Sequence, residues 1–245
     1  MQPSSCYNFS MSFFISLGIV LLAMLIMALL QLQPGVFLLL CHHSTGKYPK
    51  THVSHLTLFF ILGVEVISAC LFLSIYYITN IFFLQFFRPE TSFWAFIAVG
   101  IFIALALICL FGYFRGSRGT RLFISRKYAQ ILDQKARTVK SPSDAFTLGA
   151  FSGLAELIFT IPLYIITSLE IIEMSVEFIP SHLLTLLYII TPTIPLFIIR
   201  WRFQAGHNLV DIQKSRVRHK DLTRLTLFAS YLAIAILIII FRITI

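Results

Sequence analysis

The chain has 245 residues, of which 58% are hydrophobic and 12% charged, and its formal net charge is +9. Soluble globular domains contain roughly half apolar and about a quarter charged residues, so this composition excludes an ordinary soluble domain and predicts an all-α integral membrane protein. The basic residues stand beside the ends of apolar segments, where they set orientation and meet anionic lipid headgroups. The charge therefore predicts the lipid bilayer, and no nucleic acid, as a partner.

Six apolar segments follow one another along the chain. Crossing a hydrocarbon core about 30 Å thick takes roughly 20 apolar residues in a helix. The segments that meet this length lie near residues 12–40, 56–80, 92–114, 145–169, 182–199 and 224–243. The first has no positive charge before it and is too long for the apolar core of a signal peptide. We therefore predict six transmembrane helices, the first of which is retained.

The Lys and Arg residues are unevenly distributed over the connecting loops. Seventeen of the nineteen lie in three loops, 41–55, 115–144 and 200–224, whereas 170–181 holds three Glu residues and no Lys or Arg. Short loops rich in Lys and Arg are retained on the cytoplasmic side. Because a six-span arrangement puts these three loops on one side, it predicts an inner (plasma) membrane protein with its N-terminus and C-terminus outside.

The basic connector 115–144 separates a first half, residues 1–114, from a second half, residues 145–245. Each half has three spans, and this odd number inverts the second half relative to the first. Inverted repeats are typical of secondary transporters, whose binding site lies near the midplane between the repeats. The first span of each half also carries a proline, Pro34 or Pro162, where we expect the helix to bend and free a carbonyl group.

Part of the connector, LFISRKYAQILDQKA, has the pattern of an amphipathic helix. The apolar positions that can share one strip are Leu122, Ile124, Tyr128, Ile131 and Leu132. Such a helix lies either on the inner membrane surface or in solvent as an ordinary linker, and the pattern does not decide between these interpretations.

Two carboxylates lie inside apolar spans, Glu65 in the first half and Glu156 in the second. A charged side chain at the bilayer centre costs about 2.5 kcal/mol or more, so such residues usually face the bundle interior or a wet cavity. We interpret both as proton or cation sites, and the structural alternative is a protonated, hydrogen-bonded glutamic acid. In a continuous helix, Glu156 shares one face with small and polar residues, namely Gly149, Gly153, Thr160 and Thr167.

Polar residues and prolines interrupt two further spans. In the first span these residues are Gln31, Gln33, Pro34 and Gly35, and in the fifth they are Tyr188, Thr191, Pro192, Thr193 and Pro195. The two prolines of the fifth span predict a broken or strongly kinked helix. Freed carbonyl groups beside hydroxyls are typical material for a cation site, although a purely structural kink explains the same pattern.

Other residue types give weaker hypotheses. The candidates for a metal site are His42, His43, His52 and His55, near Cys41 at the inner end of the first two spans; a solvated or headgroup-binding loop is the alternative, since adjacent histidines point apart on a helix. The four cysteines form no CxxC pair, and we interpret them as small hydrophobic residues. No catalytic or cofactor-binding motif is visible, so we predict neither an enzyme nor a cofactor.

Six spans in two inverted halves, with a proline in the first span of each half, resemble the lysine-exporter (LysE) superfamily and its DsbD/CcdA thiol-transfer relatives. The segments that carry this resemblance are LLQLQPGVFLLL and FTLGAFSGLAELIFTIPLY. The thiol-transfer branch has a cysteine near each proline, whereas this chain has Gln33-Pro34-Gly35 and Ile161-Pro162-Leu163. What the resemblance implies is therefore export of a small solute or metal ion.

Together these features predict a polytopic inner-membrane transporter or exporter of a small solute or cation, with a proton as one candidate coupling ion. A non-transporting membrane scaffold or assembly factor is the first alternative, and a thiol-reductant conduit of the DsbD/CcdA type is the second. The sequence leaves the oligomeric state open, including a homo-oligomer. A transporter should give water a path to both carboxylates, whereas a scaffold should bury them dry and paired.

Overall fold

The structure is a computed structural model that describes residues 4–30, 32–45, 47–86, 92–112, 126–175 and 181–243. All regular elements in these ranges are helices, which confirms the predicted all-α class. The helices are α1 (Ser4–Leu29), α2 (Leu32–Ser44), α3 (Lys50–Phe86), α4 (Ser92–Phe111), α5 (Arg126–Thr138), α6 (Pro142–Leu154), α7 (Leu157–Ser175), α8 (Ser181–Ile190), α9 (Ile194–Gln204), α10 (Leu209–Arg218) and α11 (Lys220–Ile243), with a 3-10 turn, η1 (Thr191–Thr193), between α8 and α9.

In the part of the chain that the structure describes, five helical segments are long and apolar enough to cross a membrane, so the chain has the features of a multi-pass membrane protein. They are Phe13–Ser44, Lys50–Phe82, Leu157–Met174, His182–Gln204 and Lys220–Ile240. The remaining predicted span corresponds to α4, whose apolar stretch Ala95–Phe111 is shorter. Within the described residues, five of the six predicted spans therefore meet the length requirement, and the sixth, α4, packs along α11.

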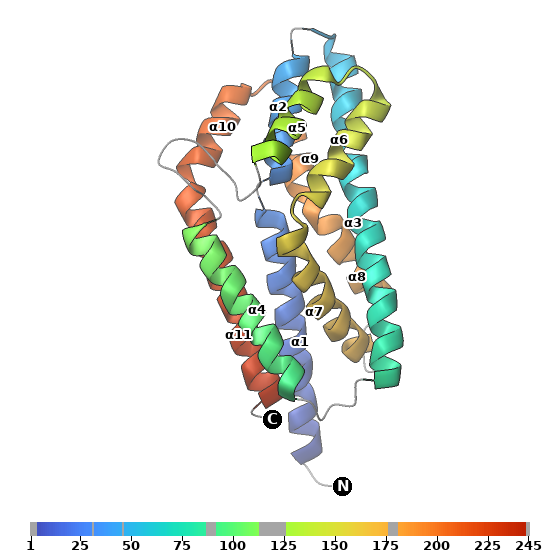
Figure 1. Cartoon of the computed structure of the whole chain (residues 1–245), viewed down its shortest axis with the longest axis vertical. Helices are drawn as coiled ribbons and strands as arrows, with labels where there is room; N and C mark the ends of the chain where they lie inside the picture. Colours follow the sequence, from blue (N-terminus) through green and yellow to red (C-terminus); the bar gives the residue numbers. More distant parts are fainter. Residues whose placement is uncertain are drawn as a thin grey trace.

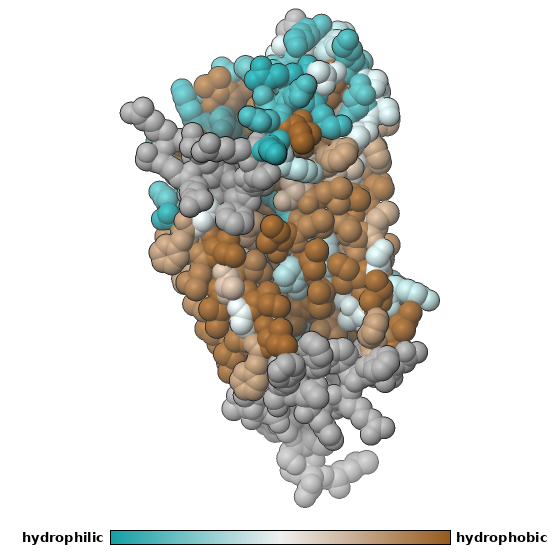
Figure 2. Space-filling model, viewed as in Figure 1, coloured by the Kyte–Doolittle hydropathy of each residue, from teal (hydrophilic) through white to brown (hydrophobic). Residues whose placement is uncertain are grey.

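The helices form an elongated bundle in which both chain ends lie at one end and α5 lies at the other (Figure 1). On the face shown in Figure 2, hydrophobic residues cover the middle of the molecule, and hydrophilic residues gather at the end that holds α5. Many large apolar side chains are exposed, among them Leu21, Tyr77, Ile101, Leu186 and Ile236. An exposed apolar surface of this extent fits contact with lipid.

Two spans predicted as continuous helices are broken. The first span ends as α1 at Leu29 and resumes as α2 at Leu32, so Pro34 lies in the first turn of a new helix, where its missing N–H has no intrahelical acceptor to lose. The span predicted at 145–169 is divided into α6 and α7 by a turn at Ala155 and Glu156, and Pro162 lies inside α7. The helix is therefore interrupted before Pro34 rather than merely bent, whereas the residues expected on one face, Gly149, Gly153, Glu156, Thr160 and Thr167, are all buried although a turn separates α6 from α7.

Glycines do allow α3 and α6 to pack closely. A Cβ atom added at Gly63 would overlap the carbonyl oxygen of Phe146, and one added at Gly149 would overlap the carbonyl oxygen of Phe60. A Cβ at Gly153 would lie 2.7 Å from Cγ2 of Ile67. Gly149 and Gly153 form a GxxxG pair, a pattern that predicts close approach of a neighbouring helix, and α3 is that neighbour.

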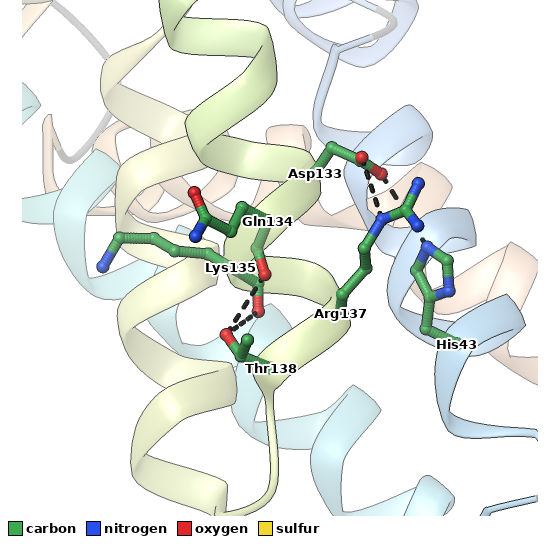
Figure 3. Close-up of polar contacts among 6 residues, drawn as sticks. All are labelled: His43, Asp133, Gln134, Lys135, Arg137 and Thr138. Carbon is green, nitrogen blue, oxygen red and sulfur yellow. Dashed lines mark hydrogen bonds and ion pairs between the residues drawn. The ribbon is translucent and has the colours of Figure 1, made fainter.

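The connector helix α5 packs on the protein. Leu132 is 1% exposed in a core shared with α2 and α6, and the Tyr128 hydroxyl donates to the Phe151 carbonyl oxygen at 2.7 Å. Asp133 accepts from Arg137 at 3.0 Å and lies 3.8 Å from His43 on α2 (Figure 3). The apolar strip of α5 therefore faces mainly protein rather than lipid, although Ile131 is exposed. Leu122 and Ile124, which precede α5, lie outside the described residues.

Candidate functional site

The buried apolar residues fall into two separate cores, one on each side of a polar layer. Along α3, Val64 belongs to one core and Phe72 to the other. In the other three spans the first and second helices likewise belong to different cores: α1 and α2, α6 and α7, and α8 and α9. Polar or broken segments of all four spans therefore lie between the two cores.

The three helix breaks also lie close together. The 3-10 turn η1 packs against α1 and α3, and α1 packs against α7. The α1–α2 break lies near the middle of the apolar segment Phe13–Ser44, and η1 lies near the middle of His182–Gln204. In the lipid-facing zone, backbone that leaves the helix is tolerated only where protein or a water-filled cavity surrounds it. The breaks thus form a buried central layer.

Glu156 lies in the turn between α6 and α7 and is 2% exposed. Its Oε1 accepts a hydrogen bond from the Leu32 backbone N–H at 2.8 Å. The first N–H groups of a helix have no intrahelical acceptor, and a carboxylate is favourable at this positive end. Glu156 therefore caps α2 from the other half of the chain and ties two helix breaks together. This bond fits the structural interpretation of Glu156 and does not test the functional one.

Glu65 lies half-buried on α3 and contacts the Thr193 side chain of η1. Thr193 is 1% exposed, and its hydroxyl donates to the Ile190 carbonyl oxygen at 2.8 Å. The Thr193 hydroxyl has one hydrogen, so it cannot donate to the Ile190 carbonyl oxygen and to Glu65 at the same time. The second carboxyl oxygen of Glu65, Oε2, is buried and has no hydrogen-bond partner among the described residues.

Sequence reasoning missed two residues of this layer, Tyr164 and Ser68. The Tyr164 hydroxyl lies beside Ser68 and Thr160 and within electrostatic range of both Glu65 and Glu156. Thr160 is 2% exposed, and its Oγ1 has no partner at hydrogen-bonding geometry among the described residues. A Thr and a Tyr four residues apart share a helix face, and this spacing was the available signal.

Aromatic rings close the layer on the side of the chain termini. The Phe72 ring centroid lies 5.7 Å from that of Tyr164 and 4.7 Å from that of Tyr188, and the two tyrosine rings lie 6.0 Å apart. Tyr188 is 1% exposed. Edge-to-face and tilted pairs at these separations are favourable, so the three rings form one aromatic cluster beside the polar layer.

The remaining candidate residues are placed as follows. Gln33 is buried in the first turn of α2, whereas Gln31 lies outside the described residues. Thr191 lies in η1 and donates to the Leu187 carbonyl oxygen at 2.8 Å. Pro192 lies in the same 3-10 turn and Pro195 in the first turn of α9, so the fifth span is interrupted at its two prolines.

A third buried carboxylate belongs to Glu170, which the sequence placed in an outer loop. α7 continues to Ser175, and Glu170 is 1% exposed within it. The prediction of a loop from residue 170 was wrong. It relied on three glutamates in a short stretch and gave too little weight to the apolar residues between them. Charge alone did not reveal that the Glu170 side chain is buried, whereas Glu173 is partly exposed and Glu177 lies outside the described residues.

The four histidines form no common cluster, although the rings of His42 and His43 pack edge to face with their centroids 5.4 Å apart. His43 lies near Asp133, His52 contacts the Lys140 carbonyl oxygen at 3.1 Å, and His55 is exposed. Among the described residues, no three His, Cys, Asp or Glu side chains are grouped to hold a metal ion. The thiols of Cys41, Cys70 and Cys109 are free. The hypotheses of a histidine metal site and of a thiol relay therefore gain no support.

No protein-family model, no curated protein and no solved structure matches this chain.

Proposed function

We propose that the protein is a transporter of a small solute or cation, with its site in the polar layer around Glu65 and Glu156. One observation carries this proposal: interrupted helices meet near the middle of the apolar spans, with two buried or half-buried carboxylates between two apolar cores. Discontinuous helices at this depth, with free backbone ends and acidic side chains, are the usual construction of a transporter site.

The arrangement of the helices supports two inverted halves. In that proposal α1–α2, α3 and α4 form the first half, and α6–α7, α8–α9 and α11 form the second. Equivalent spans then pair across the halves, because α1 packs against α7 and α4 packs against α11. A resemblance to the LysE superfamily implies the same construction, and export is the direction that the resemblance favours.

Alternating access gives a test that needs no known substrate. In a variant with all four native cysteines replaced, Ser68→Cys is expected to react with a membrane-impermeant thiol reagent in sealed vesicles, because a transport site must open to water. Ile19→Cys, at a fully buried core position, is the matched control and should stay unlabelled.

A membrane scaffold is the competing function, and the buried bond between Glu156 and Leu32 favours it. A scaffold keeps the polar layer dry on both sides. Absence of Ser68→Cys labelling from either face, in folded protein, would therefore reject the transporter.

We expect the termini and α5 to lie on opposite sides of an inner membrane, with α5 in the cytoplasm. The two chain ends lie at the end of the bundle opposite α5 (Figure 1), and the connector is rich in Lys and Arg. In the cysteine-free background, Ser4→Cys should label from outside the cell and Thr138→Cys only after the membrane is opened. Labelling of both from the same side would contradict this orientation.

A further inference from the structure

We infer that the polar layer contains a site for a dehydrated monovalent metal cation of the sodium class, between α3, α7 and η1. This inference rests on the proposed function, because it names a cation that the same site would bind. The side chains that would hold the ion are Glu65, Ser68, Thr160, Tyr164 and Thr193. The histidines and free cysteines considered above belong to other parts of the fold.

The donor chemistry of these residues is uniform. Glu65 offers a carboxylate, and the other four offer hydroxyls, so every candidate ligand is oxygen. Oxygen ligands suit hard cations, whereas zinc, copper and iron favour sites with imidazole or thiolate. The described residues hold no group of His, Cys and carboxylate side chains that would favour those transition metals.

Two of these oxygens point to a missing ligand. Glu65 Oε2 and Thr160 Oγ1 are buried without a hydrogen-bond partner among the described residues, and Thr160 is only 2% exposed. Buried polar atoms in folded proteins nearly always have a partner, and an exception calls for an explanation such as an ion. Tyr164 lies beside Thr160 and Ser68, and its ring packs on Phe72, one turn along α3 from Ser68, so α3 and α7 face each other at these residues.

The charge available at the site favours a single positive charge. Oε1 of Glu156 is engaged by the Leu32 N–H and by the positive end of α2. Glu65 is then the one carboxylate in the proposed ligand set. An uncompensated second charge is very costly in an apolar interior, so a divalent ion fits less well than a monovalent one.

The surroundings explain why the ion would be dehydrated. The rings of Phe72, Tyr164 and Tyr188 pack together on one side, and the core around Phe37 and Phe60 lies on the other. Fixed oxygen ligands would have to replace the hydration shell. Carbonyl groups of unwound helices and the C-terminal ends of half-helices do this in transporters, and the end of α8 at Ile190 enters this site through Thr193.

Direct binding of radioactive ²²Na⁺ to the purified full-length chain, at constant pH and ionic strength, tests the inference without requiring transport. We expect saturable binding by the wild type, competed by unlabelled Na⁺ and not by N-methyl-D-glucamine. Glu65→Gln and Thr160→Val should each weaken binding roughly tenfold or more, which is the usual effect of removing a residue that supports a metal site. Ser168→Ala should bind as wild type, because that buried hydroxyl donates to the Tyr164 carbonyl oxygen within α7.

The outcomes separate this inference from the proposed function. Absence of saturable binding by folded wild type, or unchanged binding in both Glu65→Gln and Thr160→Val, overturns the sodium site, and a proton-only carboxylate then remains compatible with transport. If Glu65→Gln fails to fold, Thr160→Val decides alone. Sodium binding by a protein whose Ser68→Cys variant is never labelled would keep the site and reject the transporter.

Discussion

Alanine at Gly63 or Gly149 is expected to prevent stable packing of α3 on α6. In each case the added Cβ would overlap a backbone carbonyl oxygen of the facing helix. A backbone cannot rotate away as a side chain can, so the helices must separate. Overpacking of this kind costs typically about 1–3 kcal/mol and occasionally more. We expect loss of the monodisperse peak in size-exclusion chromatography in detergent, or a lower melting temperature.

Gly100→Ala provides the matched control, since no atom lies within 4 Å of its added Cβ. This variant should behave as wild type or better, because alanine favours helices over glycine. Gly153→Ala tests the argument further, since its added methyl meets a side-chain atom of Ile67. Ile67→Ala should restore the Gly153→Ala variant and should not restore Gly149→Ala. Wild-type stability of both Gly63→Ala and Gly149→Ala would contradict the packing described for α3 and α6.

The sequence was sufficient to predict the class of the fold and two central residues. Long apolar segments require helices in a membrane, because every backbone group must find a partner within its own segment. Glu65 and Glu156 were conspicuous because carboxylates are costly at this depth. The interruption at Pro192 and Pro195 was also predictable, since proline removes a backbone donor.

The break near Leu30 has a local cause, because Pro34 lies four residues later and its ring clashes with the carbonyl group at that distance. The turn at Ala155 and Glu156 could not be predicted in this way, since Ala and Glu are good helix formers. The proline of each half lies a few residues later. A tertiary contact stabilises these breaks: the Glu156 carboxylate accepts the hydrogen bond of the Leu32 N–H, which has no acceptor within its own helix. A contact across 124 residues leaves no local signature in the sequence.

Glu156→Gln is expected to fold normally and to lose proton-coupled transport. The amide oxygen of glutamine can accept the Leu32 N–H as Oε1 of Glu156 does, so the bond between the two helix breaks is kept. An amide cannot take up or release a proton, however, and it cannot provide a negative charge to the site. Flux measured in proteoliposomes under an imposed proton gradient should therefore fall to the level of protein-free vesicles, with an unchanged melting temperature.

Glu156→Leu separates the structural part of this role from the functional part. Leucine offers no acceptor, so the buried Leu32 N–H at the start of α2 would be left unpaired, at a cost of about 1–3 kcal/mol. We expect a lower melting temperature for Glu156→Leu than for Glu156→Gln, together with loss of flux in both. If Glu156→Gln transports as wild type while Glu156→Leu is unstable, Glu156 is a helix cap alone, and Glu65 becomes the remaining candidate for the coupling carboxylate.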